Sequence, residues 1–96
     1  MVIGVLRLSL HFHEAHSLKA KRGPLRKVIA QVRNHFDVAV AEVGEQDKWQ
    51  VAELGVATVG SSAPVINSCL DQVLNFVDSL GAAELVDHQI EIIHLS

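Results

Sequence analysis

The sequence has 96 residues and a formal net charge of −3, which is enough chain for one small domain and excludes a multidomain enzyme. Apolar residues make up 49% of it, and only two prolines and six glycines occur, which excludes a long disordered tail and a fibrous repeat. The single Cys69 cannot close an intramolecular disulfide, no apolar run approaches the roughly 20 residues that span a bilayer, and no signal peptide is recognisable, so we expect a cytoplasmic protein that meets no membrane.

Residues 2–12 alternate between two kinds of side chain, as in a strand with one buried face. The apolar side of this strand holds Leu6, Leu8, Leu10 and Phe12. In the next segment apolar residues recur at three- and four-residue spacing, which predicts a helix whose body covers residues 24–36. The start of this helix stays open, because Ser17 is a good N-cap whereas Gly23-Pro24 favours a start at Pro24.

Two stretches rich in Val and Ala, residues 38–43 and 49–59, flank the polar residues 45–48 and predict a β-hairpin. Ser61 and Ser62 then offer N-caps for a second helix, Pro64 suits its first turn, and Gly81 ends it. The apolar stripe of this helix holds Ile66, Cys69, Leu70, Val73, Phe76, Val77 and Leu80. Residues 85–95 alternate again and predict a last strand.

The element order β-α-β-β-α-β, with a hairpin in the middle, predicts an α+β ferredoxin-like fold in a single domain over residues 1–96. We expect a four-stranded antiparallel sheet with the strand order 4-1-3-2, counted along the chain, and both helices on one face. The side chains expected under the helices are Leu6, Leu8, Leu10, Leu54, Val56, Ile90 and Ile92. Across the strands of the opposite, open face, Arg7 should reach Glu53 or Glu91. The other residues expected on that face are Ile3, Val5, Val38, Val40, Glu42, Trp49, Val51, Gln89 and Ile93.

Three segments carry a family resemblance: Ser17-Leu-Lys-Ala-Lys-Arg22, Val40-Ala-Glu-Val-Gly44 and Gln46-Asp-Lys-Trp-Gln-Val-Ala-Glu-Leu-Gly-Val-Ala-Thr-Val-Gly60. With them the chain resembles, over nearly its whole length, the small bacterial YlxP-like family, a domain of unknown function. The resemblance implies a ferredoxin-like fold. Because genes of the family often neighbour those of translation factors, it also implies an association with RNA or the ribosome. Gly23-Pro24 and His11-Phe12-His13 differ from the residues commoner in that family.

Three histidines near the end of the first strand, His11, His13 and His16, match the H-x-H-x-x-H spacing of some metal sites. Two interpretations are open: a metal site, or histidines that are solvated or half-buried. The second is favoured, because hydrolases with related spacings need further ligands, which no other histidine of the chain is spaced to supply. We therefore predict no metal site.

No arrangement for nucleophilic or phosphate chemistry is recognisable in the sequence. Cys69 lies on the apolar stripe of the second helix, where a thiol usually acts as a small core residue. No Gly-x-Ser-x-Gly elbow places a serine beside a histidine, and neither glycine-rich phosphate-binding pattern occurs. We expect no enzyme activity and no cofactor.

The charges are unevenly distributed, since residues 15–36 carry +6 and no acidic residue while the rest of the chain carries −9. The six cations of this basic segment are Lys19, Lys21, Arg22, Arg26, Lys27 and Arg33. If the helix runs through position 23, Lys19, Arg22, Arg26 and Arg33 follow one stripe that can displace counterions from a phosphate backbone. The alternative is a solvated helix face that binds nothing.

The favoured interpretation is a non-enzymatic accessory of translation that binds RNA or the ribosome through this basic segment, without reading base sequence. The open sheet face is a poor RNA platform, because Glu42, Glu53 and Glu91 repel phosphate and few aromatic rings are offered for stacking. The alternative is a protein-interaction module, expected to form a homodimer through an apolar patch on that face. The predicted patch holds Ile3, Val5, Val38, Val40, Trp49, Val51 and Ile93.

Overall fold

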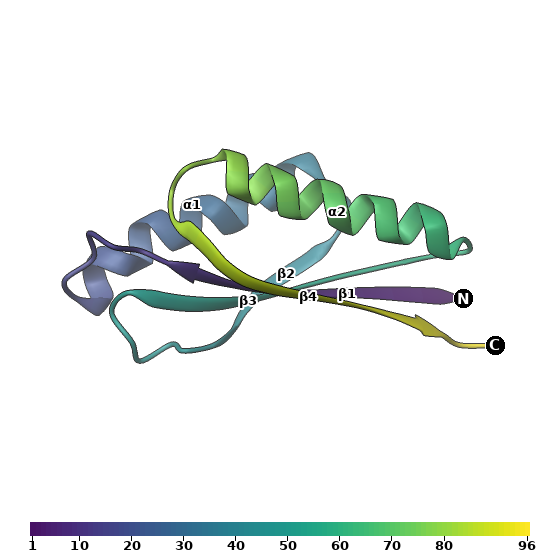
Figure 1. The fold of residues 1–96 in the computed structure, drawn as a ribbon, viewed down its shortest axis with the longest axis horizontal. Helices are drawn as coiled ribbons and strands as arrows, with labels where there is room; N and C mark the ends of the chain where they lie inside the picture. Colours follow the sequence, from purple (N-terminus) through teal and green to yellow (C-terminus); the bar gives the residue numbers. More distant parts are fainter.

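The computed structural model describes all residues from Met1 to Ser96. Its elements, in chain order, are β1 (Val2–His11), α1 (Leu18–His35), β2 (Ala39–Gly44), β3 (Val51–Gly60), α2 (Ala63–Ser79) and β4 (Glu84–His94). The strands form one antiparallel sheet in the order β2-β3-β1-β4, and both helices lie on the same side of it (Figure 1). The predicted ferredoxin-like fold is confirmed, since 4-1-3-2 is the same order read from the other edge.

β1 lies inside the sheet and shows how the sequence produces the core. Its residues alternate between buried and half-buried along the whole strand, as the alternation of its side chains predicts. The buried face packs under the two helices, and the largest fully buried side chains there are Leu6, Leu8, Leu10, Leu54, Leu70, Val28, Val32, Val56 and Val73. Ile90 and Ile92 of β4 pack against this core half-buried, so the predicted helix-covered side is confirmed.

The start of α1, which the sequence left open, lies before the Gly23-Pro24 pair. The helix begins at Leu18 and continues through both residues. The Oγ atom of Ser17 caps it by accepting a hydrogen bond from the N–H of Ala20 at 3.0 Å. Pro24 has no N–H and leaves the carbonyl of Ala20 without its helical donor, a loss that the packing of the inner face of α1 offsets. That inner face consists of Lys21, Leu25, Val28 and Val32.

α2 approaches β1 closely at Gly4. A Cβ atom on Gly4 would overlap Ile66 and would come within 2.9 Å of Leu70, so only glycine fits this crossing. Ser62 occupies the N-cap position of α2, although its side chain makes no capping hydrogen bond. Past the other end of the helix, Gly81 has a φ of +67°, in the left-handed region where glycine is unstrained. The prediction that Gly81 ends this helix is confirmed.

The two ends of the sheet differ in what they carry. At one end lie the chain termini, where the Met1 ammonium donates to the carbonyl of Leu95 at 2.8 Å. At the opposite end lie the connections from β1 to α1, from β2 to β3 and from α2 to β4 (Figure 1). Three stretches far apart in the sequence therefore meet there. Neither helix is long and apolar enough to cross a bilayer.

Candidate functional site

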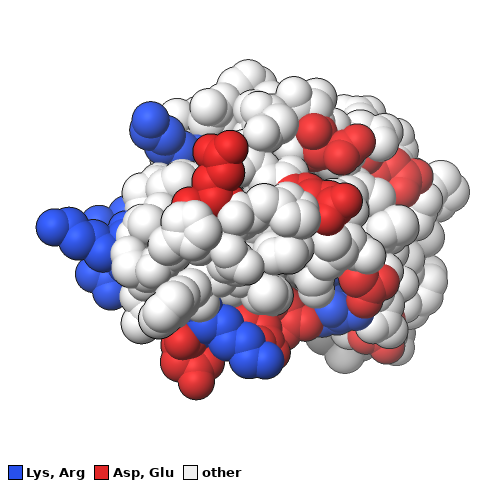
Figure 2. Space-filling model, turned by 60° about the vertical axis from the view of Figure 1, so that its left-hand side comes forward, with Lys and Arg blue, Asp and Glu red and all other residues white.

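The first three turns of α1 carry four exposed cations, Lys19, Arg22, Arg26 and Lys27, and the helix contains no acidic residue. Because α1 is continuous through residue 23, the first three follow one another at three- and four-residue spacing along one stripe. In Figure 2 several Lys and Arg side chains gather at one side of the molecule, whereas acidic side chains are spread over the rest of that view. We call these four residues the basic face of α1.

Lys21, predicted to bind RNA with its neighbours, points inward instead, and that part of the prediction is wrong. The residue is only 3% exposed. Its Nζ atom donates to the carbonyls of Glu45 and Val51 at 3.0 Å each and lies 3.5 Å from Oε2 of Glu42. An ammonium has three donors, so these acceptors satisfy it without water. Position 21 shares a helix face with the buried Leu25, which directs Lys21 toward the β2–β3 hairpin.

Arg33, also predicted to contact RNA, reaches back to the sheet. Its Nη2 atom donates to the carbonyl of Val40 at 2.9 Å, so the guanidinium is tied to β2, an outer strand of the sheet. The guanidinium has further N–H donors, but this bond holds it beside the sheet edge. The basic face of α1 is therefore defined without Arg33.

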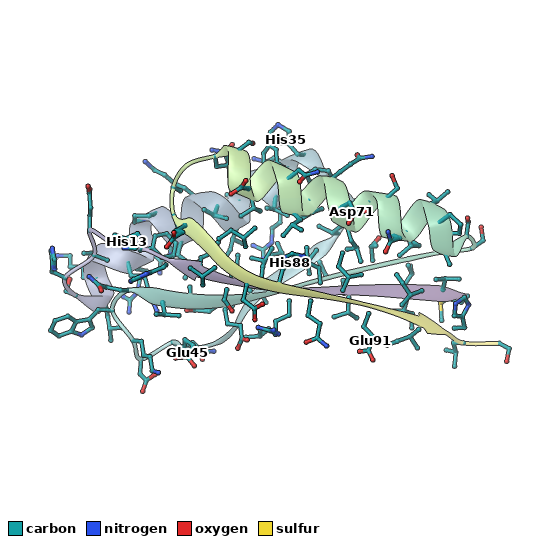
Figure 3. All side chains as sticks on the ribbon, viewed as in Figure 1. His13, His35, Glu45, Asp71, His88 and Glu91 are labelled. Carbon is teal, nitrogen blue, oxygen red and sulfur yellow. The ribbon has the colours of Figure 1, made fainter.

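The open face of the sheet holds a second group of charges around Arg7. Nη1 of Arg7 donates to Oε1 of Glu53 at 2.8 Å, and Nη2 donates to Oδ2 of Asp87 at 3.1 Å. The pairing with Glu53 is confirmed, whereas Glu91 makes no such bond because it pairs with Val5 across the ladder and lies farther along β4. Glu91 nevertheless faces away from the helices, as predicted (Figure 3).

Hydrogen bonds within this group shift two pKa values in opposite directions. The bonds from Arg7 to Asp87 and to Glu53 raise the pKa of the Arg7 guanidinium. The bond from Arg7, followed by one from the backbone of His88, lowers the pKa of the Asp87 carboxyl. Both shifts favour the charged forms of Arg7 and Asp87, and the ion pairs of Arg7 link β1, β3 and β4.

Val38 and Val40 do not lie on the open face, so that part of the predicted patch is wrong. Val40 stands opposite Val56 in the ladder, and residues directly opposite each other in an antiparallel pair share a face. Val56 is buried under the helices, and Val40 is correspondingly 5% exposed. Val38 precedes β2 and packs against the same core, and Glu42 lies on this side with its partner Lys21. The residues of β2 on the open face are Ala39, Ala41 and Val43.

The other predicted patch residues fall into two groups. Ile3, Val5, Val51 and Ile93 lie on the open face, alternating with the more buried residues of their strands. Trp49 lies in the β2–β3 connection, not in a strand, and is 58% exposed. With the corrected register, a shallow depression on the open face is lined by exposed and half-buried residues that we call the apolar patch: Val5, Ala39, Ala41, Val43, Gly55 and Ala57.

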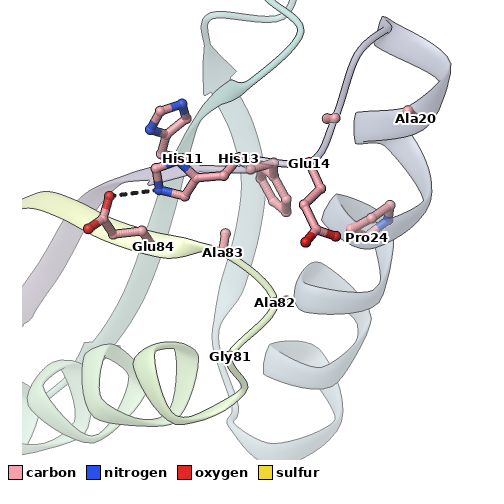
Figure 4. A pocket seen from close by; sticks show the side chains of 11 residues that line it. His11, His13, Glu14, Ala20, Pro24, Gly81, Ala82, Ala83 and Glu84 are labelled. Atoms are coloured by element: carbon pink, nitrogen blue, oxygen red, sulfur yellow. Dashed lines mark hydrogen bonds and ion pairs between the residues drawn. The ribbon is translucent and has the colours of Figure 1, made fainter.

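Two of the three histidines near the end of β1 meet a carboxylate that the sequence analysis missed. The rings of His11 and His13 have their centroids 3.9 Å apart. Nε2 of His13 lies 2.9 Å from Oε1 of Glu84 (Figure 4). His16 is not part of this group. The signal that could have found Glu84 is the antiparallel pairing of the first and last strands, whose register places it opposite His11.

A cavity of about 380 Å³ lies beside this histidine pair, between the ends of β1, α1 and α2. Ala20 and Pro24 of α1 form one wall, and the turn from Gly81 to Glu84 forms another. The carboxylate of Glu14 points toward α1 and away from the histidines (Figure 4). The cavity thus has imidazole and carboxylate groups at one side, which suits a cation or a small polar ligand.

Comparison with known proteins supplies the family. A family model described as a protein of unknown function (DUF503) matches residues 3–90. This chain belongs to the DUF503 family. A relative, the uncharacterized protein YlxP of Bacillus subtilis (strain 168), is 37% identical over 83 residues, which are 86% of this chain and 90% of that protein. The resemblance seen in the sequence is therefore confirmed.

A solved structure extends the comparison to the fold of this DUF503 chain. The de novo designed protein Foldit4 is similar with a TM-score of 0.52 and 12% sequence identity. The likeness covers 99% of this chain and 98% of the designed one. At this identity it concerns the fold alone.

Proposed function

We propose that this DUF503 protein is a non-enzymatic, RNA-binding accessory of translation and that the basic face of α1 contacts RNA phosphates. One observation carries the proposal: a single continuous helix presents Lys19, Arg22, Arg26 and Lys27 to solvent with no acidic residue among them. Cations held on one rigid surface release counterions from a phosphate backbone together, which gives favourable, salt-dependent binding.

Two further cations of α1 bind the sheet: Lys21, which is buried, and Arg33, which is exposed but donates to a backbone carbonyl. Lys21 and Arg33 bind backbone carbonyls of the β2–β3 hairpin and of β2, so α1 is held to the sheet near both of its ends. A helix fixed in this way loses little freedom when it binds a ligand, which favours affinity. The four exposed cations include no aromatic ring that could stack on a base, so recognition depends on charge and shape.

The test is a salt series of gel shifts with a hairpin fragment of ribosomal RNA. The double substitution Arg22→Ala with Arg26→Ala is expected to weaken binding and to reduce the slope of log K against log salt by about 1.4 to 1.8, because two phosphate contacts are lost. Its melting temperature should stay close to that of the unmodified protein, because both side chains are exposed.

Two control variants make this test specific. Arg22→Lys with Arg26→Lys keeps the charge and should retain binding, whereas Lys48→Ala removes a cation in the β2–β3 connection and should leave binding unchanged. If the double alanine variant binds RNA as tightly as the unmodified protein, the basic face has no part in RNA binding and the proposal fails.

The apolar patch supports a second candidate function, self-association through the open sheet face. Val43 and Ile93 on this face are 55% and 41% exposed, and the corrected register makes the side chains of β2, β3 and β1 continuous across the depression. A two-fold dimer lets one patch cover its own copy. Arg7 and Glu53, beside the patch, could pair with the same residues of the second copy and so fix its orientation.

Light scattering over a concentration series tests this second candidate. Val43→Asp should shift a dimer toward the monomeric mass, and Val65→Asp, at a 66% exposed position on α2, is the matched control. Val40 is unsuited to this test because its substitution would place a charge in the core. A monomeric mass of the unmodified protein at high micromolar concentration would exclude the homodimer.

A further inference from the structure

The histidine pair at the end of β1 has the chemistry of a metal site. His11 and His13 offer two imidazole nitrogens, and Glu84 offers a carboxylate. Two histidines with one carboxylate form a donor set that Zn²⁺ and other divalent transition-metal ions bind in proteins. We propose that these three residues bind one such ion, with Zn²⁺ as the representative case.

The distances allow the three donors to converge on one ion. One ligand atom from each residue lies within 4.8 Å of the other two, and Nε2 of His13 and Oε1 of Glu84 are 2.9 Å apart. In a tetrahedral site with bonds of about 2.0 to 2.1 Å, neighbouring ligand atoms are about 3.3 Å apart. Small side-chain rotations of the kind that exposed residues make readily are therefore enough to close the site. The backbone need not move, because the ladder already places His11 opposite Glu84.

Gln50 holds the histidine segment from the neighbouring strand end. Its Nε2 donates to the carbonyl of His13 at 3.1 Å, and its own backbone carbonyl accepts from the N–H of Phe12. Its Oε1 lies 3.5 Å from Nε2 of His11. An acceptor on one ring nitrogen of a histidine leaves the other nitrogen for a metal, which is the usual second contact of metal-binding histidines. Gln50 is thus a positioning residue for the proposed site.

The cavity beside the three donors determines what kind of metal site this is. The donors lie at one side of the space of about 380 Å³ between the ends of β1, α1 and α2 (Figure 4). The side chains of His13 and Glu84 are each 58% exposed. Three protein ligands leave a fourth position for water or for a ligand that enters the cavity, in contrast to a closed structural site with four protein ligands. We expect exchangeable metal and a fold that does not depend on it.

The simpler alternative is an ordinary ion pair between His13 and Glu84. An exposed pair of this kind contributes little to stability. It requires neither the ring of His11 nor the contact between that ring and the side chain of Gln50. The two explanations differ in their response to a metal ion, since only a metal site requires all three donors at once.

The experiment is a calorimetric titration of the purified, tag-free protein with Zn²⁺, followed by Co²⁺ titration read by visible absorption. We expect one ion per chain. His13→Ala and Glu84→Gln should each weaken Zn²⁺ binding by at least about tenfold, because each removes a direct ligand. Circular dichroism should show the same folded state for all variants, since both side chains are largely exposed.

His16→Ala and His94→Ala are the matched controls, because each removes a histidine outside the group. Both variants should bind Zn²⁺ with the affinity of the unmodified protein to within about twofold, because substitutions outside the site act independently of it. The proposal is overturned if no stoichiometric binding occurs, if Glu84→Gln binds as tightly as the unmodified protein, or if His16→Ala loses as much affinity as His13→Ala.

Discussion

The two faces of the sheet each hold one cation paired with carboxylate, in very different surroundings. Under the helices, the side chain of Lys21 is 4% exposed and binds two backbone carbonyls besides Glu42. On the open face, the side chain of Arg7 is 34% exposed and binds Glu53 and Asp87. Lys21 has exchanged water for protein acceptors, whereas water still competes for every partner of Arg7.

This difference separates cations that hold the fold from cations that are available to a ligand. Lys21 lies in the most basic segment of the sequence, yet it is buried and its ammonium binds acceptors inside the molecule. Its exposed neighbours Lys19 and Arg22, on the same helix, present theirs to solvent. A run of positive residues in a helix therefore indicates a binding surface only if enough of its cations lie at exposed positions, and the buried ones must not be counted.

The largest expected effect comes from Lys21→Ala. The substitution removes a buried stem and the ammonium that donates to the carbonyls of Glu45 and Val51, of which the Glu45 carbonyl keeps the N–H of Lys48. The free energy of unfolding should therefore fall by about 2–4 kcal/mol. Urea denaturation measures it. The control Lys19→Ala, at an exposed position of the same helix, should change stability by less than about 0.5 kcal/mol. Equal stabilities of the two variants would show that the buried contacts of Lys21 contribute nothing.

A smaller effect is expected where α2 crosses β1. Gly4→Ala places a methyl group against Ile66 and Leu70 and should lower the free energy of unfolding by about 1–3 kcal/mol through overpacking. Gly23→Ala is the matched change on the solvent side of α1, where a Cβ meets nothing within 4 Å, and it should raise stability by up to about 1 kcal/mol. Thermal melts of both variants give the comparison, and a stable Gly4→Ala protein would contradict the close approach of helix and strand.

The smallest effect concerns Asp87 on the open face. Its pKa is lowered in the folded protein by the hydrogen bond from Arg7, so its contribution is complete above the ordinary Asp pKa and is lost as the pH falls through the lowered value. Asp87→Asn should therefore be slightly less stable than the unmodified protein at pH 7, and the difference should disappear in strong acid. Urea unfolding at a series of pH values measures the difference in free energy of unfolding between the two proteins. A difference that persists at the lowest pH would argue against the assigned ion pair.

The element order, the alternation of β1 and the apolar stripes of both helices were readable from the sequence, because long periodic segments leave one consistent assignment. The phase of β2 was not readable. Residues 38–41 are all Val or Ala, so both faces of the strand look equally apolar, and only pairing with β3 decides between them. The inward position of Lys21 depends likewise on where α1 begins, which the Gly23-Pro24 pair obscured.

The residues of the candidate metal site could also be predicted only in part from the sequence. The spacing of histidines along the chain identified His11 and His13 but also included His16. His16 is close to them in sequence, but it lies outside the group in the folded chain. Glu84 is far away in sequence and is brought in by strand pairing. Contacts between distant segments depend on register, and register follows from the whole sheet and not from any one segment.

The burial of Lys21 has a consequence for the chemical reactivity of the protein. Amine-reactive reagents modify lysines in proportion to their access to solvent, so the exposed Lys19, Lys27 and Lys48 will be labelled in the native state. Lys21 becomes reactive only when the start of α1 separates from the β2–β3 hairpin, since both sides of that hairpin hold its ammonium. Its rate of labelling therefore reports how often this end of the molecule opens while the rest stays folded.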